Sequence, residues 1–426
     1  MRKSRSGIIA VLDIGTTKIV CFIAQINADN ELKIIGIGHQ LAQGIKAGTI
    51  SDMRLAENSI IAAVSAAEKM AGETIDKVVI SVSGAMPQSV NVSASIDISG
   101  EQVSPRDIKR AIIRAKEQYQ YDETKRRIIH AIPISFSVDD IRGVDDPIGM
   151  TGDMLTADVH LITASESAIK NIANCVSRCQ LEIQDYVIAS HAAALSALTD
   201  DERELGVTML EMGGGVTGIS VFYRGRNIFT DSVSFGGTNI TSDIARGLST
   251  SLTCAERIKT LYGSAVTSSS DHDTSIEISI MNEDTGEYDE EVSISKTKLL
   301  EVTIPRVDEI FEMVHKKMEQ NSILRIASQQ IVLSGGASQL VGLRELAMKK
   351  FGKHVRLGRP ELIDGMADFT SNASFAASAG LINYILNNYH IYDKVEPSAR
   401  YLGPNVSLNT NQGVFSGLFN WFKENF

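Results

Sequence analysis

"IIAVLDIGTTKIVCFIAQI", residues 8–26, places a short polar turn between two apolar runs. The runs are rich in Ile and Val, so we expect a buried strand, a tight turn at residues 15–18 and a second buried strand. Glycine at the tip of a hairpin leaves backbone N–H groups bare, and such donors bind phosphate oxygens. Thr16 and Thr17 add hydroxyl groups, and Lys18 adds a positive charge. The stretch therefore predicts a phosphate-binding β-hairpin.

A second stretch, "GVTMLEMGGGVTGISVFYR" at residues 206–224, repeats this plan. In both halves the hairpin is followed by a third strand, at residues 33–39 and 228–236, and then by a helix with Ser and Asp near its start. Each half later offers a buried strand that runs into glycine, at residues 77–84 and 330–338. Single glycine hairpins are common, but here the order and the turn chemistry agree twice. The sequence therefore predicts a duplicated α/β unit.

Acidic residues stand just before both turns, Asp13 in the first half and Glu211 in the second. A carboxylate at this position would repel phosphate, but it can hold Mg²⁺, usually through water. Two facing hairpins therefore predict a clamp for a Mg-nucleotide, with Asp13 and Glu211 as the metal-holding residues. "LSGGASQLVGLRELA" adds a third piece, in which Gly335 and Gly336 open a helix. A helix N-terminus favours an anion, and close backbone approach to a ribose is equally compatible with this sequence.

The adenine side of the predicted site rests on "CAERIKTLYG", where Glu256 and Lys259 lie on one helix face. Their side-chain stems can cover an adenine ring, although a solvated salt pair gives the same spacing. The predicted nucleotide-binding residues are Asp13, Gly15, Thr16, Thr17, Lys18, Gly213, Gly214, Gly215, Val216, Thr217, Gly236, Gly237, Asn239, Glu256, Lys259, Gly335, Gly336 and Ala337.

Three motifs together resemble the actin-like ATPase superfamily, which includes actin, heat-shock chaperone ATPases and sugar kinases. "DIGTTK" is similar to its first phosphate loop, "EMGGGVT" to its second and "SGGAS" to its adenosine loop. Actin carries extra material after its third strand, but here the extra material follows "VVISVSG", from about residue 85 to about residue 160. This arrangement, with "DDERELGVTMLEMGGG" and "ITSDIA", resembles the FtsA family of bacterial division proteins and its relocated subdomain 1C.

The resemblance implies an α/β, actin-like (RNase H-like) duplicated two-lobe fold with a relocated subdomain 1C and a C-terminal amphipathic helix. It also implies ATP and Mg²⁺ as ligands. The expected divisions are 1–84 for subdomain 1A, 85–160 for 1C, 161–203 for the rest of 1A, 204–246 for 2A, 247–328 for 2B, 329–394 for the rest of 2A with a return to 1A, 395–412 for a flexible linker and 413–426 for the helix. The acid-rich stretch at residues 268–294 fits a β-hairpin on 2B, and a disordered acidic loop is the alternative.

The catalytic group cannot be assigned from the sequence. Glu211 stands where the family has Asp, and its extra methylene moves the carboxylate by roughly 1.5 Å. Superfamily hydrolases position water from the helix after "YVIAS", where a rough alignment offers His191, which can equally cap or pack. His191 and Glu211 are thus candidates only, and the nucleotide is expected to act mainly as a clamp that sets conformation and assembly. A small-molecule kinase on this fold would need a base aimed at the γ-phosphate.

The last fourteen residues, "GVFSGLFNWFKENF" at 413–426, form an aromatic-rich segment behind a Pro-, Gly- and Asn-containing linker. On a helix its apolar side chains share one face, which suits the membrane interface but also suits a helix docked on the core. Lys423 is the only basic residue in the segment, so apolar burial must supply most of any membrane affinity. The predicted membrane-contacting residues are Val414, Phe415, Leu418, Phe419, Trp421, Phe422, Lys423 and Phe426.

Composition and the resemblance together define the expected partners. The formal net charge of −11 argues against a general nucleic-acid binder, and four cysteines without C-x-x-C spacing indicate buried thiols. The resemblance implies self-assembly into filaments on the cytoplasmic face of the inner membrane at midcell. It further implies that subdomain 2B binds the C-terminal peptide of FtsZ, the tubulin-like ring protein, and that later division proteins bind near 1C. Other actin-like ATPases are the alternative.

Overall fold

The structure is a computed structural model that describes most of the chain. The described residues are 7–26, 32–119, 125–280, 290–321, 323 and 330–392. The predicted linker at 395–412 and the predicted amphipathic helix at 413–426, with all the predicted membrane-contacting residues, lie outside this set.

The first lobe is built on a five-stranded sheet in the order β11-β6-β1-β2-β3. β1 pairs antiparallel with β2 and parallel with β6, and both faces of the sheet are buried by helices. Its strands are β1 (Gly7–Ile14), β2 (Lys18–Ile26), β3 (Leu32–Leu41), β6 (Lys77–Val82) and β11 (Glu182–Ile188), and a small hairpin is formed by β4 (Ile45–Lys46) and β5 (Thr49–Ile50). Its helices are α1 (Met53–Ala71), α3 (Glu166–Arg178) and α4 (Ala189–Ala197).

The second lobe repeats that topology with a sheet in the order β14-β13-β12-β17-β18. β12 pairs antiparallel with β13 and parallel with β17, as β1 pairs with β2 and β6. The strands are β12 (Val207–Met212), β13 (Thr217–Tyr223), β14 (Arg226–Val233), β17 (Gln330–Ser334) and β18 (His354–Leu357). The helices are α6 (Gly237–Gly247), α8 (Lys296–Gln320) and α9 (Leu343–Phe351), and α5 (Asp200–Leu205) links the lobes. The last helix, α10 (Ala376–Tyr392), follows β18 and returns to pack on the sheet of the first lobe. The predicted duplication is confirmed.

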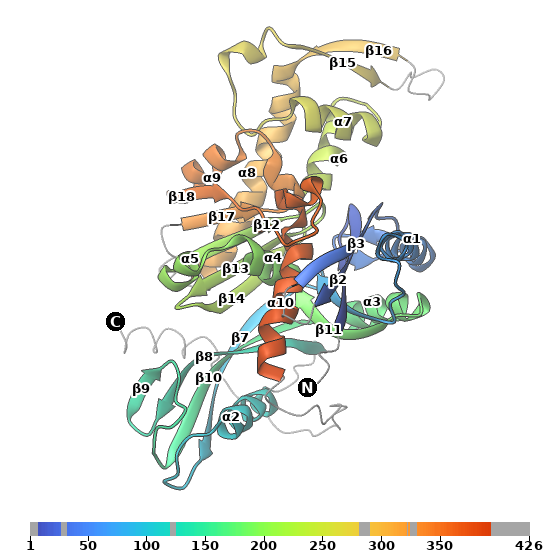
Figure 1. The fold of residues 1–426 in the computed structure, drawn as a ribbon. Helices are drawn as coiled ribbons and strands as arrows, with labels where there is room; N and C mark the ends of the chain where they lie inside the picture. The colour runs from blue at the N-terminus through green and yellow to red at the C-terminus, as the bar shows by residue number, and fades with distance from the viewer. Residues whose placement is uncertain are drawn as a thin grey trace.

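A separate four-stranded sheet, ordered β7-β10-β8-β9, is inserted between β6 and α3. Figure 1 shows it as a distinct layer at the end of the molecule opposite β15 and β16. Its elements are β7 (Gln88–Asp97), α2 (Pro105–Gln118), β8 (Arg126–Val138), β9 (Ile141–Val144) and β10 (Met154–Ser165). Ser104 and Asp107 form a capping box at the start of α2, whose small residues Ala111 and Ala115 are fully buried in the core of this sheet.

The second lobe carries its own extension between α6 and α8. It contains α7 (Leu252–Tyr262), η1 (Ser269–Asp271), β15 (Ser275–Ile280) and β16 (Glu290–Ser295). β15 and β16 pair antiparallel, and Ile276 and Ile278 are buried while Glu277 between them is exposed. This alternation explains why the strand forms in so acidic a stretch. Short 3-10 turns complete the fold: η3 (Gly336–Gln339), η4 (Asp368–Ser371) and η5 (Ala373–Phe375).

Helices α4 and α10 occupy equivalent places in the two halves and pack against each other between the lobes (Figure 1). Their closest approach is at Gly380, where an added Cβ would lie 1.7 Å from the carbonyl oxygen of Ala192. Ser196 Oγ donates to the Ala376 carbonyl at 2.6 Å, and Asn383 Nδ2 donates to the Leu195 carbonyl at 3.1 Å. The helices therefore meet backbone to backbone, which any larger residue at position 380 would prevent.

We expect Gly380→Ala to destabilise the protein by about 2 kcal/mol or more, because overpacking a buried backbone contact forces the two helices apart. Thermal unfolding followed by circular dichroism measures the effect. Gly336→Ala is the matched control, since its Cβ would meet Ser374 at an ordinary 3.7 Å. Equal melting temperatures for the two variants would contradict the assigned role of Gly380.

Candidate nucleotide-binding cleft

The two predicted phosphate hairpins have the same turn geometry. In the β1–β2 turn, the Gly15 N–H donates to the Lys18 carbonyl at 3.0 Å. In the β12–β13 turn, the Gly213 N–H donates to the Val216 carbonyl at 2.8 Å. Each turn is thus closed across three residue steps, and the duplicated topology places both at the same edge of their sheets.

These two turns contact each other across the lobes. A Cβ added to Gly214 would lie 2.4 Å from Thr17 Cγ2, and one added to Gly215 would lie 2.8 Å from Thr16 Oγ1. Thr16 Oγ1 also accepts a hydrogen bond from the Gly48 N–H at 2.9 Å. The glycines are therefore required for close approach, and the seam between the lobes is lined by bare peptide groups and threonine hydroxyls.

Asp13 is held by a hydroxyl group on each side. Ser81 Oγ, from β6, donates to Asp13 Oδ1 at 2.6 Å, and Ser378 Oγ, from α10, donates to Asp13 Oδ2 at 2.7 Å. The same Ser81 hydroxyl accepts from the Ile14 N–H at 2.9 Å. The carboxylate is buried and fixed in orientation, and its remaining lone pairs can still accept bonds from water on a hydrated cation. Sequence reasoning missed Ser81 and Ser378, because neither belongs to a turn motif.

Lys18 reaches from the first turn to the segment that precedes α10. Its Nζ donates to the carbonyl and, at 3.0 Å, to the hydroxyl of Ser374, and it lies 3.5 Å from the centre of the Phe375 ring. Burial lowers the pKa of Lys18 to about 8, although Asp13 and Glu211 pull it upward. The cation is therefore poised near the two carboxylates, where phosphate would join it.

Glu211 is the second carboxylate of the cleft. Burial, with repulsion from Asp13, raises the pKa of Glu211 to about 8, and Lys18 offsets part of the rise. A Cβ added to Gly213 would lie 3.7 Å from Glu211 Oε1, and a Cβ added to Gly218 would lie 3.7 Å from Glu211 Oε2. Two carboxylates that repel each other at one seam suit an oxygen-seeking cation such as Mg²⁺, whose charge would relieve the repulsion. The residues present thus fit the predicted ion.

Further glycines bring two segments against the second turn: the start of α6 and the predicted adenosine loop at Gly335. The Gly237 N–H, at the start of α6, donates to the Gly213 carbonyl at 3.0 Å, and Asn239 Oδ1 accepts from the Gly236 N–H at 2.9 Å. Gly335 has φ +85°, and a Cβ there would lie 2.4 Å from the Met212 carbonyl oxygen. Only glycine combines this left-handed backbone with such an approach.

Glu256, Lys259 and Ala337 join this group beside α6. Lys259 Nζ donates to Glu256 Oε2 at 2.7 Å and to the Gly237 carbonyl at 3.2 Å. A Cβ on Gly237 would lie 3.3 Å from the Ala337 Cβ, and Gly336 lies beside Ser374. The predicted adenine-side pair is therefore an ion pair next to the predicted phosphate loop. Val216 and Thr217 instead turn inward, since Val216 is buried and Thr217 Oγ1 donates to the Phe235 carbonyl at 2.9 Å.

The structure places His191 away from the turns. Its ring stacks on Phe222, five residues beyond the turn residue Thr217, and its Nδ1 lies 2.9 Å from Asn227 Nδ2. Burial lowers the pKa of His191 to about 4, which keeps the imidazole neutral. The preceding residue, Ser190, is buried against Gly218 of β13, and its Oγ lies 2.8 Å from Ser220 Oγ.

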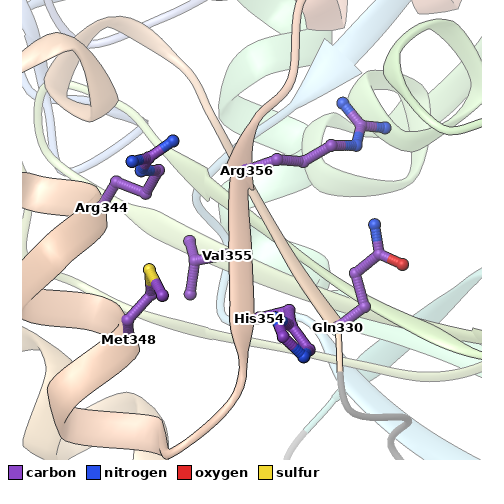
Figure 2. Close-up of a pocket in the computed structure, with 6 residues that line it drawn as sticks. All are labelled: Gln330, Arg344, Met348, His354, Val355 and Arg356. Carbon is purple, nitrogen blue, oxygen red and sulfur yellow. The ribbon is translucent and has the colours of Figure 1, made fainter.

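A cavity of about 200 Å³ lies elsewhere, between α9 and the edge strand β18. Figure 2 shows the side chains that line it. None of its lining residues belongs to the predicted set: they are Gln330, Arg344, Met348, His354, Val355 and Arg356. Arg356 Nε donates to Glu202 Oε1 at 2.6 Å, so this arginine is engaged in a structural ion pair. The cavity is therefore separate from the cleft chemistry.

The described residues contain no group of three or more His, Cys, Asp or Glu side chains arranged to hold a metal ion. A hydrated Mg²⁺ needs fewer protein ligands, because it keeps several waters. Within the same described ranges, no helix has both the length and the apolar composition needed to cross a membrane.

Comparison with known proteins identifies the family. A family model described as "Cell division protein FtsA" matches residues 208–380, and one described as "SHS2 domain inserted in FTSA" matches residues 84–163. The cell division protein FtsA of Agrobacterium fabrum is 36% identical over 436 residues, covering 100% of this chain and 96% of that protein. FtsA of Rhizobium meliloti is 37% identical over 434 residues, covering 99% and 96%. The chain belongs to the FtsA family.

Solved structures show the fold of this FtsA-family protein. A chain of the PilM–PilN type IV pilus biogenesis complex matches with a TM-score of 0.62 at 14% identity, covering 88% of this chain and 97% of that chain. MreB5 of Spiroplasma citri bound to ADP matches with a TM-score of 0.53 at 14% identity, covering 90% and 97%. The predicted actin-like fold is confirmed, and the protein is an actin-like cell-division protein. The residues matched by the model of the domain inserted in FtsA, 84–163, coincide with the four-stranded sheet of β7 to β10.

The raised pKa of Glu211 predicts a pH-dependent stability cost in this FtsA-family protein. The folded state keeps a proton on Glu211 that the unfolded chain releases near pH 4.5, so stability falls as pH rises from about 4.5 to about 8. Glu211→Gln removes this cost, and we expect its melting temperature to exceed that of the wild type by roughly a few degrees at pH 8–9. At pH 4, where both states hold the proton, the advantage should vanish.

Thermal melts across this pH range make the measurement. Glu301→Gln, at an exposed position on α8, is the control that changes the same charge outside the cleft. Parallel pH profiles for wild type and Glu211→Gln would show that Glu211 is ionised in the folded protein.

Proposed function

We propose that the cleft binds Mg-ATP and that nucleotide binding sets the conformation and assembly of the protein. The observation that carries the proposal is the pair of matching glycine turns in contact across the lobes, with Asp13, Glu211 and Lys18 beside them. The MreB5 structures with a similar fold are bound to ADP and to AMPPNP.

Each part of the site has a chemical task in this proposal. Turn N–H groups, the hydroxyls of Thr16 and Thr17, and Lys18 hold the phosphates, because each donates hydrogen bonds to oxygen. Asp13 and Glu211 hold hydrated Mg²⁺, which neutralises phosphate charge. The residues beside α6 and η3 cover the nucleoside, with the Glu256–Lys259 pair toward the adenine. No described residue is placed as a general base, so hydrolysis is not part of the proposal.

The larger role follows from family membership. We assign the inserted sheet to subdomain 1C and the extension with α7, β15 and β16 to subdomain 2B, with the boundaries expected from the sequence. In this role residues 413–426 anchor the protein to the cytoplasmic face of the inner membrane at midcell, and the protein self-assembles there. There it tethers the FtsZ ring through the C-terminal peptide of FtsZ at 2B, and later division proteins bind near 1C. Family membership and the aromatic C-terminal sequence support this proposal.

Isothermal titration calorimetry with Mg-ATP tests the nucleotide proposal. We expect saturable binding by protein freed of carried-over nucleotide, and about a tenfold weaker affinity for Asp13→Asn, because half of the carboxylate pair is lost. Thr17→Val, an isosteric change at an exposed turn residue, should weaken binding less.

The matched control is Ser135→Ala, which removes a buried hydroxyl that donates to Asp158 at 2.9 Å in the inserted sheet. It should bind Mg-ATP like the wild type. Folded wild-type protein that gives no binding heat and no thermal shift with Mg-ATP would refute the proposal.

A pair of substitutions tests the membrane proposal with equal charge on opposite helix faces. Phe419→Glu places a carboxylate on the predicted apolar face, and Asn420→Glu places it on the predicted polar face. Loss of one large apolar contact is worth about 1.5–3 kcal/mol, so we expect Phe419→Glu to lower vesicle binding at least about tenfold. Asn420→Glu should remain close to the wild type.

Co-sedimentation with vesicles of mixed zwitterionic and anionic lipid measures the binding, and emission from Trp421, the single tryptophan, reports insertion. Deletion of residues 413–426 should abolish sedimentation and leave Mg-ATP affinity unchanged. Equal sedimentation of the deletion and the full chain would exclude this segment as the anchor.

A further inference from the structure

Helix α10 begins at the cleft, where one serine in the helix and one just before it contact the first phosphate hairpin. Ser378 in its first turn donates to Asp13, and Ser374, two residues before the helix, accepts from Lys18 through its carbonyl and hydroxyl. The Phe375 ring completes the contact under the Lys18 ammonium group. Both charged residues of the first hairpin are thus bound to the start of one helix, across more than 350 residues of sequence.

The middle of α10 is a stiff element. Gly380 packs on the α4 backbone at Ala192, and hydrogen bonds from Ser196 and Asn383 fix the two helices on either side of this point. A helix locked by backbone contact moves with its partner rather than bending. A displacement at the start of α10 is therefore carried along the pair.

Further along, α10 contacts the root of the inserted sheet. Tyr384 donates its hydroxyl to Asp185 Oδ2 at 2.9 Å, and its ring meets the edge of His130, from β8, at a centroid distance of 5.7 Å. His130 Nε2 in turn accepts from the Ile188 N–H at 3.2 Å. Tyr384 is six residues beyond Ser378, or roughly 9 Å along the helix. α10 therefore joins Asp13 to His130 of the inserted sheet, and Figure 1 shows the helix running toward the end of the molecule that holds this sheet.

Lys18 cannot serve Ser374 and a phosphate equally well. Its ammonium group has three N–H donors, and two of them bond to the carbonyl and the hydroxyl of Ser374. The positive charge also makes a cation–π contact with the ring of Phe375. A phosphate offers a stronger, charge-assisted partner, and the ammonium group must turn toward the seam to reach it.

We propose that nucleotide phosphate withdraws Lys18 from Ser374 and Phe375, and that α10 carries this change to the inserted sheet at Tyr384 and His130. The inference rests on the proposed function, because it requires a nucleotide phosphate at the turns. Asp13 remains tied to Ser378, so the exchange of the Lys18 contact is the moving part. The inserted sheet thereby responds to occupancy of a cleft that it does not line.

Amide hydrogen exchange on the full-length protein tests this inference. We expect Mg-AMPPNP to raise exchange in residues 376–387 of α10 by about fivefold or more, because a charge-assisted contact at the start of the helix is lost. Exchange should also change in residues 126–138 of β8. Lys18→Met should raise exchange in α10 without any nucleotide, and Ser374→Ala, which keeps the carbonyl contact, should produce a smaller rise.

Ser135→Ala is again the control, and its exchange in α10 should stay within about twofold of the wild type. Calorimetry on the same samples separates the two proposals. If the wild type binds Mg-AMPPNP but exchange in α10 and β8 is unchanged, the inference is overturned and the nucleotide proposal stands. If no nucleotide binds, both are overturned. A rise in α10 with Lys18→Met but none in β8 would also overturn it, because the helix would then not reach the inserted sheet.

Discussion

The contact between two glycine turns is the constraint on which the whole arrangement depends. Thr17 lies against Gly214, and Thr16 lies against Gly215, at distances that leave no space for a Cβ. Each turn ends a hairpin at the centre of its lobe, so this contact fixes where the two five-stranded sheets face each other. Because the seam is made of peptide groups and threonine hydroxyls, it is built from the kinds of group that bind anions. Any side chain at these positions would separate the lobes.

The two halves differ most in how they treat their carboxylates. Asp13 receives hydroxyl groups from Ser81 and Ser378, so its orientation is fixed from within its own lobe and from α10. Glu211 lacks this arrangement, and burial with repulsion from Asp13 raises its pKa to about 8. A duplicated fold thus carries one firmly oriented carboxylate and one that exchanges a proton near neutral pH.

The repeated hairpins could be predicted from sequence because the information is local. Strand-forming runs, glycine turns and the acid before each turn stand within about ten residues, and the duplicated order then implied two lobes. The position of the inserted sheet was predictable for a related reason, since the resemblance placed extra chain after residue 84. These features depend on neighbours in sequence, which a pattern can show.

The rest of the site depends on tertiary contacts that no local pattern encodes. Ser374, Phe375 and Ser378 lie in a stretch that reads as an ordinary helix start, and only the folded chain brings them to Asp13 and Lys18. The prediction of His191 met the opposite difficulty. Its residue type suggested chemistry, but in the folded chain its ring is buried and stacks on Phe222.

The inserted sheet belongs to the first lobe in chain order, but it also forms hydrogen bonds with the second lobe. Ser89 of β7 accepts from the Thr230 N–H at 2.6 Å, and His160 Nδ1 of β10 donates to the Asn227 carbonyl at 2.8 Å. Arg226 donates to the Pro133 carbonyl at 2.9 Å. Burial lowers the pKa of His160 to about 4, so its imidazole is neutral and its contact with Asn227 is an uncharged hydrogen bond.

The inserted sheet therefore spans the side of the molecule where both lobes and α10 meet. A sheet tied to both lobes by buried hydrogen bonds resists any rotation of one lobe against the other, since each broken bond would leave a buried polar group unpaired. Closure of the cleft must then either strain this junction or move the sheet. In this actin-like protein, the inserted sheet is thus linked mechanically to any movement of one lobe against the other.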